Sequence, residues 1–152
     1  MRIRDKIKKP QRPVVAYEIL PPREKDGTLN TYAETISSLL SQTHIDAINI
    51  PEVHDEIGRG ERPVSNQERG EPRKFGMLLQ DIVGVEAIIN RVVVHMPMKK
   101  QMEWIQETHS KYEIDNLIIV GGESSKQQYP GPTVNESLER ISEVNRHRKS
   151  NI

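Results

Sequence analysis

Cysteine is absent from the 152-residue chain, so disulfide bonds, thiolate nucleophiles and cysteine-ligated metal sites are excluded. An excess of charge is absent as well: 22 basic and 22 acidic side chains give a formal net charge of zero, which argues against a nucleic-acid partner. Aromatic residues make up only 4% of the chain, so aromatic packing contributes little to a core. No run approaches the roughly 18 consecutive apolar residues of a membrane span. We therefore expect a cytoplasmic protein with no membrane partner.

The length and the first residues limit the domain organisation. At 152 residues the chain suits a single domain, 1–152, and is too short for a complete eight-unit α/β barrel. Residues 1–12 form a locally basic N-terminal arm, without the apolar stretch that follows the charged start of a signal peptide. Residues 52–72 are polar and contain several glycines and prolines, which predicts a loop of unusual length.

Apolar runs typical of strands alternate along the chain with patterns typical of amphipathic helices. The expected strands are residues 14–20, 45–50, 91–96 and 116–120. The expected helices are residues 31–42, 72–82, a short piece at 85–90, 98–112, and 135–146, the last with Leu138, Ile141 and Val144 facing inward. Four successive βα units, with strands apolar on both faces, predict an α/β fold with a parallel sheet covered by helices. The pattern leaves open a small doubly wound sheet and half of an eight-unit barrel.

Polar groups or glycines stand near the end of every expected strand. The carboxyl ends of parallel strands share one edge of a sheet, so these groups are expected to meet at one rim. They are Glu18 on the first strand, Asn49 on the second, His95 closing the third, and Gly121, Gly122 and Glu123 after the fourth. This rim is the candidate functional site.

Glu18 is the most informative of these residues. A carboxyl group inside an apolar strand loses hydration, which raises its pKa and suits it to general acid catalysis. Strand alternation equally allows Glu18 to face solvent or to pair with a buried arginine. His95 is more often a hydrogen-bonded histidine at a strand end than a catalytic residue or ligand. Glu123 is either a functional carboxylate or a solvated loop charge.

Glycines and histidines complete the set of candidate residues. The pair Gly121-Gly122 allows a ligand to approach the backbone closely, although no phosphate-loop or dinucleotide pattern surrounds it. None of the five histidines is spaced as a metal-binding pair, so no metal site is predicted.

Residues 17–23 resemble the opening of the methylenetetrahydrofolate reductase family, with the sequence Tyr-Glu-Ile-Leu-Pro-Pro-Arg. That opening consists of an aromatic residue, a catalytic glutamate, an apolar pair, two prolines and a basic residue. His95, the Gly121-Gly122-Glu123 segment and Tyr129 are similar to later elements of the family in order and spacing. The family usually carries Gly-Asp where this chain has Gly122-Glu123, and strands five to eight of its barrel have no counterpart here.

The resemblance implies the N-terminal half of a TIM barrel and a flavin-dependent hydride transfer. FAD, reduced by NADH or NADPH, would reduce 5,10-methylenetetrahydrofolate to 5-methyltetrahydrofolate. Glu18 would be the general acid that helps to open the five-membered ring of the folate, and Glu123 would lie near folate and flavin. The residues that would contact FAD are Asn49, His95, Gly121, Gly122 and Tyr129.

Two further hypotheses compete with an enzyme. The chain could be a non-catalytic half-barrel module that binds or assembles with a second half, or a small ligand-binding domain without redox chemistry. Four parallel strands leave two edges with unpaired backbone groups. We therefore expect a homodimer or a complex with a partner half-barrel.

Overall fold

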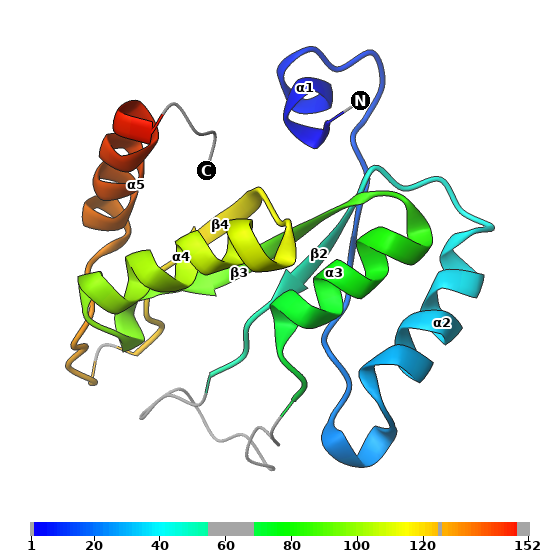
Figure 1. Cartoon of the computed structure of the whole chain (residues 1–152), viewed down its shortest axis with the longest axis horizontal. Coiled ribbons are helices and arrows are strands. Elements are labelled where there is room, and N and C mark those ends of the chain that lie inside the picture. The colour runs from blue at the N-terminus through cyan, green and yellow to red at the C-terminus, as the bar shows by residue number, and fades with distance from the viewer. Residues whose placement is uncertain (1, 55–68, 125, 149–152) are drawn as a thin grey trace.

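The computed structural model describes residues 2–54, 69–124 and 126–148, and within them the chain forms a four-stranded sheet. The strand order is β1-β2-β3-β4, and each neighbouring pair is parallel. Helices alternate with the strands along the chain (Figure 1). The expected α/β fold with parallel strands is therefore confirmed. Of the expected loop 52–72, residues 55–68 lie outside the described residues.

The first strand is shorter than its apolar run, whereas the fourth has the expected bounds. β1 spans Ala16–Glu18, β2 spans Ala47–Pro51, and β4 spans Asn116–Val120. The prediction of a strand over 14–20 is wrong at both ends, because only three residues pair with β2. All three residues of β1 are exposed, so burial on both faces is also wrong for this strand.

β3 spans Glu86–Val92, where the sequence predicts a short helix at 85–90 followed by a strand at 91–96. Alternate side chains of β3 are buried, and they include Ala87, Ile89 and Arg91. The valines that indicated a strand lie instead in a 3₁₀ turn, η2 (Val93–His95). The prediction fails because a buried arginine breaks the apolar alternation that marks a strand.

Three helices form a layer on one face of the sheet, which we call the helix face (Figure 1). They are α2 (Leu29–Leu40), α3 (Pro72–Val83) and α4 (Met98–Tyr112). α4 has the bounds that the sequence predicts. α5 (Val134–Arg148) lies beside β4, and its Leu138 is exposed, so the inward orientation expected for that residue is wrong. No helix among the described residues is long and apolar enough to cross a membrane.

Local signals determine where the helices begin. At the start of α2 the Thr28 side chain accepts a hydrogen bond from the Thr31 backbone N–H. At the start of α3 the Glu71 carboxylate accepts one from the Lys74 backbone N–H at 2.8 Å. Pro72 then takes the first helical position, where its missing N–H costs nothing. These caps satisfy N–H groups that have no partner inside the helix.

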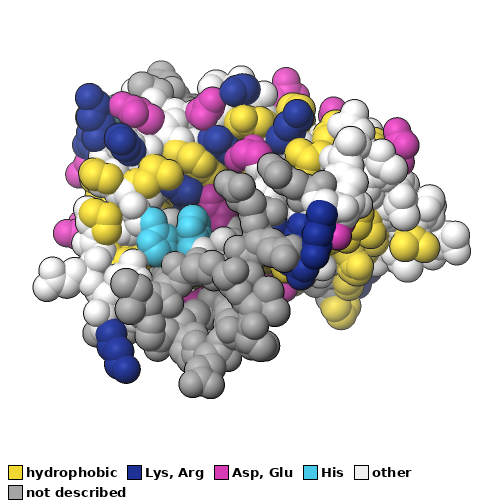
Figure 2. Space-filling view, turned by 90° about the horizontal axis from the view of Figure 1, so that it is seen from below, with side chains coloured by type: hydrophobic (Ala, Val, Ile, Leu, Met, Phe, Trp, Pro, Cys, Tyr) yellow, Lys and Arg dark blue, Asp and Glu magenta, His cyan; other side chains and the backbone are white. Residues whose placement is uncertain are grey.

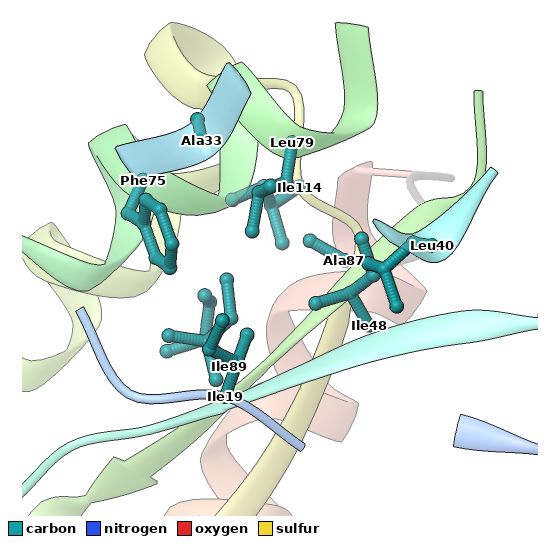
Figure 3. Packing of buried hydrophobic residues seen from close by; sticks show 10 residues of the cluster. Ile19, Ala33, Leu40, Ile48, Phe75, Leu79, Ala87, Ile89 and Ile114 are labelled. Atoms are coloured by element: carbon teal, nitrogen blue, oxygen red, sulfur yellow. The ribbon is translucent and has the colours of Figure 1, made fainter. Parts of the chain in front are cut away.

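The main hydrophobic core lies between the sheet and two of these helices, α2 and α3 (Figure 3). Phe75 and Leu79 of α3 are fully buried against the sheet. The strand residues in this core include Ile48, Ile50, Ala87 and Ile89. Alternation along the strands then places Asn49 and Asn90 on the opposite face.

A short helix that the sequence does not predict, α1 (Ile3–Lys8), lies at the amino ends of the strands. The Ile3 backbone N–H donates to the carboxylate of Glu86, the first residue of β3. Asp46 accepts hydrogen bonds from Arg12 Nη2 at 2.8 Å and Lys6 Nζ at 2.9 Å. Hydrogen bonds from Arg12, from the Val15 backbone and from Lys6 hold the pKa of Asp46 well below its usual range. The basic arm is thus held to the sheet by the carboxylates of Asp46 and Glu86.

Candidate functional site

The carboxyl ends of β1 and β2 bring Glu18 and Asn49 together, as the shared rim predicts. The two residues pair in the strand register, and Asn49 Nδ2 donates to Glu18 Oε2 at 2.9 Å. Both side chains lie on the face opposite the helices, since the neighbouring Ile48 and Ile50 pack in the core. Glu18 is exposed, so of the two orientations that the sequence leaves open, the solvent-facing one is confirmed and the buried one is wrong. The carboxylate is instead oriented by an amide and accessible from outside.

Two buried amide oxygens share this face of the sheet. The Oδ1 atoms of Asn49 and Asn90 are buried and have no hydrogen-bond partner. Asn90 pairs with Pro51 in the β2–β3 register, which places it on the same face one step nearer the rim. A buried acceptor without a donor costs free energy, so such atoms are concentrated at functional sites. Asn90 is not among the predicted site residues, because the pattern of residues 85–90 predicts a helix there.

A buried ion pair between Glu52 and Arg91 joins the segment after β2 to the end of β3, next to the rim. Arg91 Nη1 donates to Glu52 Oε1 at 2.7 Å, and the Val92 backbone N–H donates to Glu52 Oε2 at 3.0 Å. The Arg91 guanidinium also lies 4.1 Å from the centroid of the Trp104 ring. Burial raises the pKa of Glu52, but the nearby His54 and Arg91 outweigh it, so the pKa is lowered overall. Sequence reasoning missed this pair, because its partners are 39 residues apart and one of them opens a polar loop.

Three rings from different segments meet at the same rim. The His54 and His95 ring centroids are 4.5 Å apart, and those of His95 and Tyr129 are 5.6 Å apart in an edge-on arrangement. Histidine side chains lie together on the face that Figure 2 shows. His95 ends η2 rather than β3, so the prediction that it closes the third strand is wrong, although it reaches the rim. Because the rings are tilted or edge-on to one another, they form a cluster of separate aromatic contacts rather than one flat surface.

The loop after β4 is held together by Tyr129. Its hydroxyl accepts a hydrogen bond from the Ser124 backbone N–H at 2.9 Å and donates to the Ser124 carbonyl at 3.3 Å. A methyl group at Gly122 would overlap the Tyr129 ring, whereas one at Gly121 would make only an ordinary contact. Glu123 is exposed in the same loop. Gly122 and Tyr129, selected separately from the sequence, are therefore in direct contact.

The donor set of the rim suits an organic ligand better than a metal ion. Among residues 2–54, 69–124 and 126–148, no group of three or more histidine, aspartate or glutamate side chains could hold a metal ion. The rim presents the carboxylates of Glu18 and Glu123, two amide oxygens and three rings, a combination suited to an organic molecule with polar groups.

Comparisons with protein-family models and with curated proteins give no match to this chain. The likeness to the methylenetetrahydrofolate reductase family therefore rests on residues 17–23 and on the rim residues. Any assignment of function depends on the geometry of that rim.

Proposed function

We propose that this chain is half of a TIM barrel and carries out the chemistry of methylenetetrahydrofolate reductase. In this proposal a cytoplasmic flavoenzyme takes reducing equivalents from NADH or NADPH and reduces 5,10-methylenetetrahydrofolate to 5-methyltetrahydrofolate. The observation that carries the proposal is the Glu18 carboxylate, hydrogen-bonded to Asn49 and beside buried acceptor oxygens on the same face. Four parallel strands in sequential order are the arrangement of half a barrel.

The residues of the rim fit a flavin. An isoalloxazine ring is planar and has an N–H group at one edge, and Asn49 Oδ1 and Asn90 Oδ1 are buried acceptors without a donor. The rings of His95 and Tyr129 offer aromatic contacts from two directions, and Gly122 leaves the room that the Tyr129 ring occupies. The residues that would hold FAD are thus Asn49, Asn90, His95, Gly121, Gly122 and Tyr129, with Glu123 beside them. When bound, the flavin supplies the hydride.

Glu18 supplies the proton in this proposal. Asn49 Nδ2 donates a hydrogen bond to Oε2 of the Glu18 carboxyl group. In this proposal the other oxygen, Oε1, therefore carries the proton toward the folate. Opening the five-membered ring of the folate places negative charge on a nitrogen, and a positioned acid neutralises that charge as it forms. Because Glu18 is exposed, it can regain its proton from solvent between turnovers.

Flavin binding by the purified chain tests this assignment. We expect FAD fluorescence to change on titration with the chain, and Asn90→Ala to weaken binding about tenfold, the cost of one hydrogen bond. Asn30→Ala is the matched control, because Asn30 is exposed on α2, away from the rim. A parent chain that leaves FAD unchanged, or an equal effect of both substitutions, contradicts the assignment.

A non-catalytic half-barrel module is the second candidate. The observation that favours it is an apolar groove beside the free edge of β4, at a distance from the polar rim. A chain that assembles through this groove but leaves FAD unbound would belong to this class.

A further inference from the structure

A groove of about 410 Å³ follows the outer edge of β4. It is lined by β4, by Ile88 of β3, and by residues of α1 and α5. The apolar residues that line it are Ile3, Ile7, Ile88, Leu117, Ile118, Ile119, Leu138 and Ile141. Apolar side chains from two helices therefore lie beside the edge of β4.

Side chains in this groove are unusually exposed for their type. Ile7 of α1 is 61% exposed, Ile118 of β4 is 45% exposed, and Leu138 of α5 is 48% exposed. Within the described sheet β4 pairs with β3 alone, so one edge of its backbone is open. An open apolar strand edge favours the addition of a further strand. The strand that fits beside these side chains is itself apolar.

The other edge of the same sheet is apolar as far as Tyr17, and Glu18 ends the strand at the rim. In the described sheet β1 pairs with β2 alone, and its residues Ala16 and Tyr17 are exposed. Val15, just before the strand, is exposed too. Leu39, on the helix that follows β1, adds a further exposed apolar side chain. Ala16 and Tyr17 point to opposite sides of β1, so an inserted β1 would present an apolar side chain on each side.

We propose that two copies of this chain form a closed dimer in which β1 of each copy inserts into the β4 groove of the other. In a dimer with two-fold symmetry, the β1–β4 contact occurs twice. Both sheet edges of both copies are then paired, and no open edge remains. Eight parallel strands are also the number that closes a sheet into a small packed barrel. This inference goes beyond the proposed function and does not depend on flavin or folate.

Sedimentation of the intact chain tests the assembly. We expect a dimer at tens of micromolar, and we expect Leu138→Glu or Ile7→Glu to raise the dissociation constant by tenfold or more, because each places a charge in an apolar contact. Ile82→Glu is the matched control: Ile82 is 47% exposed, but it lies on α3, outside the groove. A monomer for the parent chain, or equal weakening by all three substitutions, overturns the proposal.

Thiol cross-linking tests which strands meet. The chain has no cysteine, so single cysteines introduced by Ala16→Cys and Ile118→Cys are unique. Both positions lie on the face opposite the helices, one on β1 and the other on β4. With a short bismaleimide, we expect covalent dimers from a mixture of the two variants and none from either variant alone. Cross-linking of Ile118→Cys by itself would show β4 paired with β4 and overturn the proposed pairing.

Discussion

At the scale of single residues, the pairing of Glu52 with Arg91 determines how the rim is built. Arg91 is buried on the helix face, where it also donates to Gln101 Oε1 at 2.9 Å. A buried guanidinium without a carboxylate is strongly destabilising, so Glu52 is required next to it. The pair fixes the chain just after β2, which is where His54 joins the ring cluster. The contact between Glu52 and Arg91 therefore both stabilises the fold and positions His54 at the rim.

We expect Glu52→Gln to lower the free energy of unfolding at neutral pH by about 1.5–3 kcal/mol, the worth of a hydrogen bond to a charged group. The folded-state pKa of Glu52 is lowered, so its contribution is complete above the unfolded value of about 4.3 and is lost as the pH falls through the folded value. The difference between parent and variant should therefore shrink in acid. Urea denaturation at several pH values measures it.

Glu143→Gln is the control for that experiment. Glu143 pairs with Arg140 on exposed α5 at 2.8 Å, and exposed ion pairs contribute little. We expect no measurable change in stability at neutral pH. An effect of Glu143→Gln as large as that of Glu52→Gln would contradict the importance given to the buried pair.

At the scale of elements, the loop before α5 docks on η2 through a glycine. The Gly131 backbone N–H donates to the Val94 carbonyl at 2.8 Å. A methyl group at Gly131 would overlap the carbonyl oxygens of Val93, Val94 and Met96, which are backbone atoms and yield little. This contact brings the Tyr129 loop next to His95.

We expect Gly131→Ala to destabilise the fold by about 1–3 kcal/mol, the usual cost of overpacking. Gly121→Ala is the control, because a methyl group there meets only a Val134 side chain at 3.4 Å. Denaturant midpoints of both variants give the comparison. Equal midpoints would show that the loop moves freely off η2.

The elements differ in how well the sequence predicts them. Residues 98–112 have a helical apolar stripe with Met102 and Ile105 buried, and the predicted bounds of α4 are confirmed. β3 was not predicted at its observed position, because Asn90 and Arg91 have polar side chains, and Arg91 is accommodated by pairing with Glu52, 39 residues away. α1 was missed for the same reason, since its position depends on Asp46. Local patterns predict the elements that local contacts stabilise.

At the scale of the whole molecule, the sequence predicts where the site lies better than how it is composed. The shared rim of parallel strands follows from the βα order alone, and Glu18 and Asn49 do meet there. Glu52 and Asn90 could not be found, because their significance lies in burial and in partners across the sheet. Glu18 is exposed, one of the two orientations that strand alternation allows, since the face opposite the helices is open at β1. A second copy of the chain at the sheet edges would change that exposure.

The most direct test of the account is the reoxidation of reduced flavin on the chain by 5,10-methylenetetrahydrofolate, followed by anaerobic stopped-flow absorbance. We expect the parent chain to be reduced by NADH or NADPH and then reoxidised by the folate. Glu18→Gln should slow reoxidation by about 10²–10⁴-fold, the usual loss when an acid catalyst is removed. It should leave flavin reduction largely unchanged, because that step needs no proton on the folate. Failure of the folate to reoxidise the flavin in the parent chain, or equal slowing of both steps by Glu18→Gln, would contradict the proposed reductase.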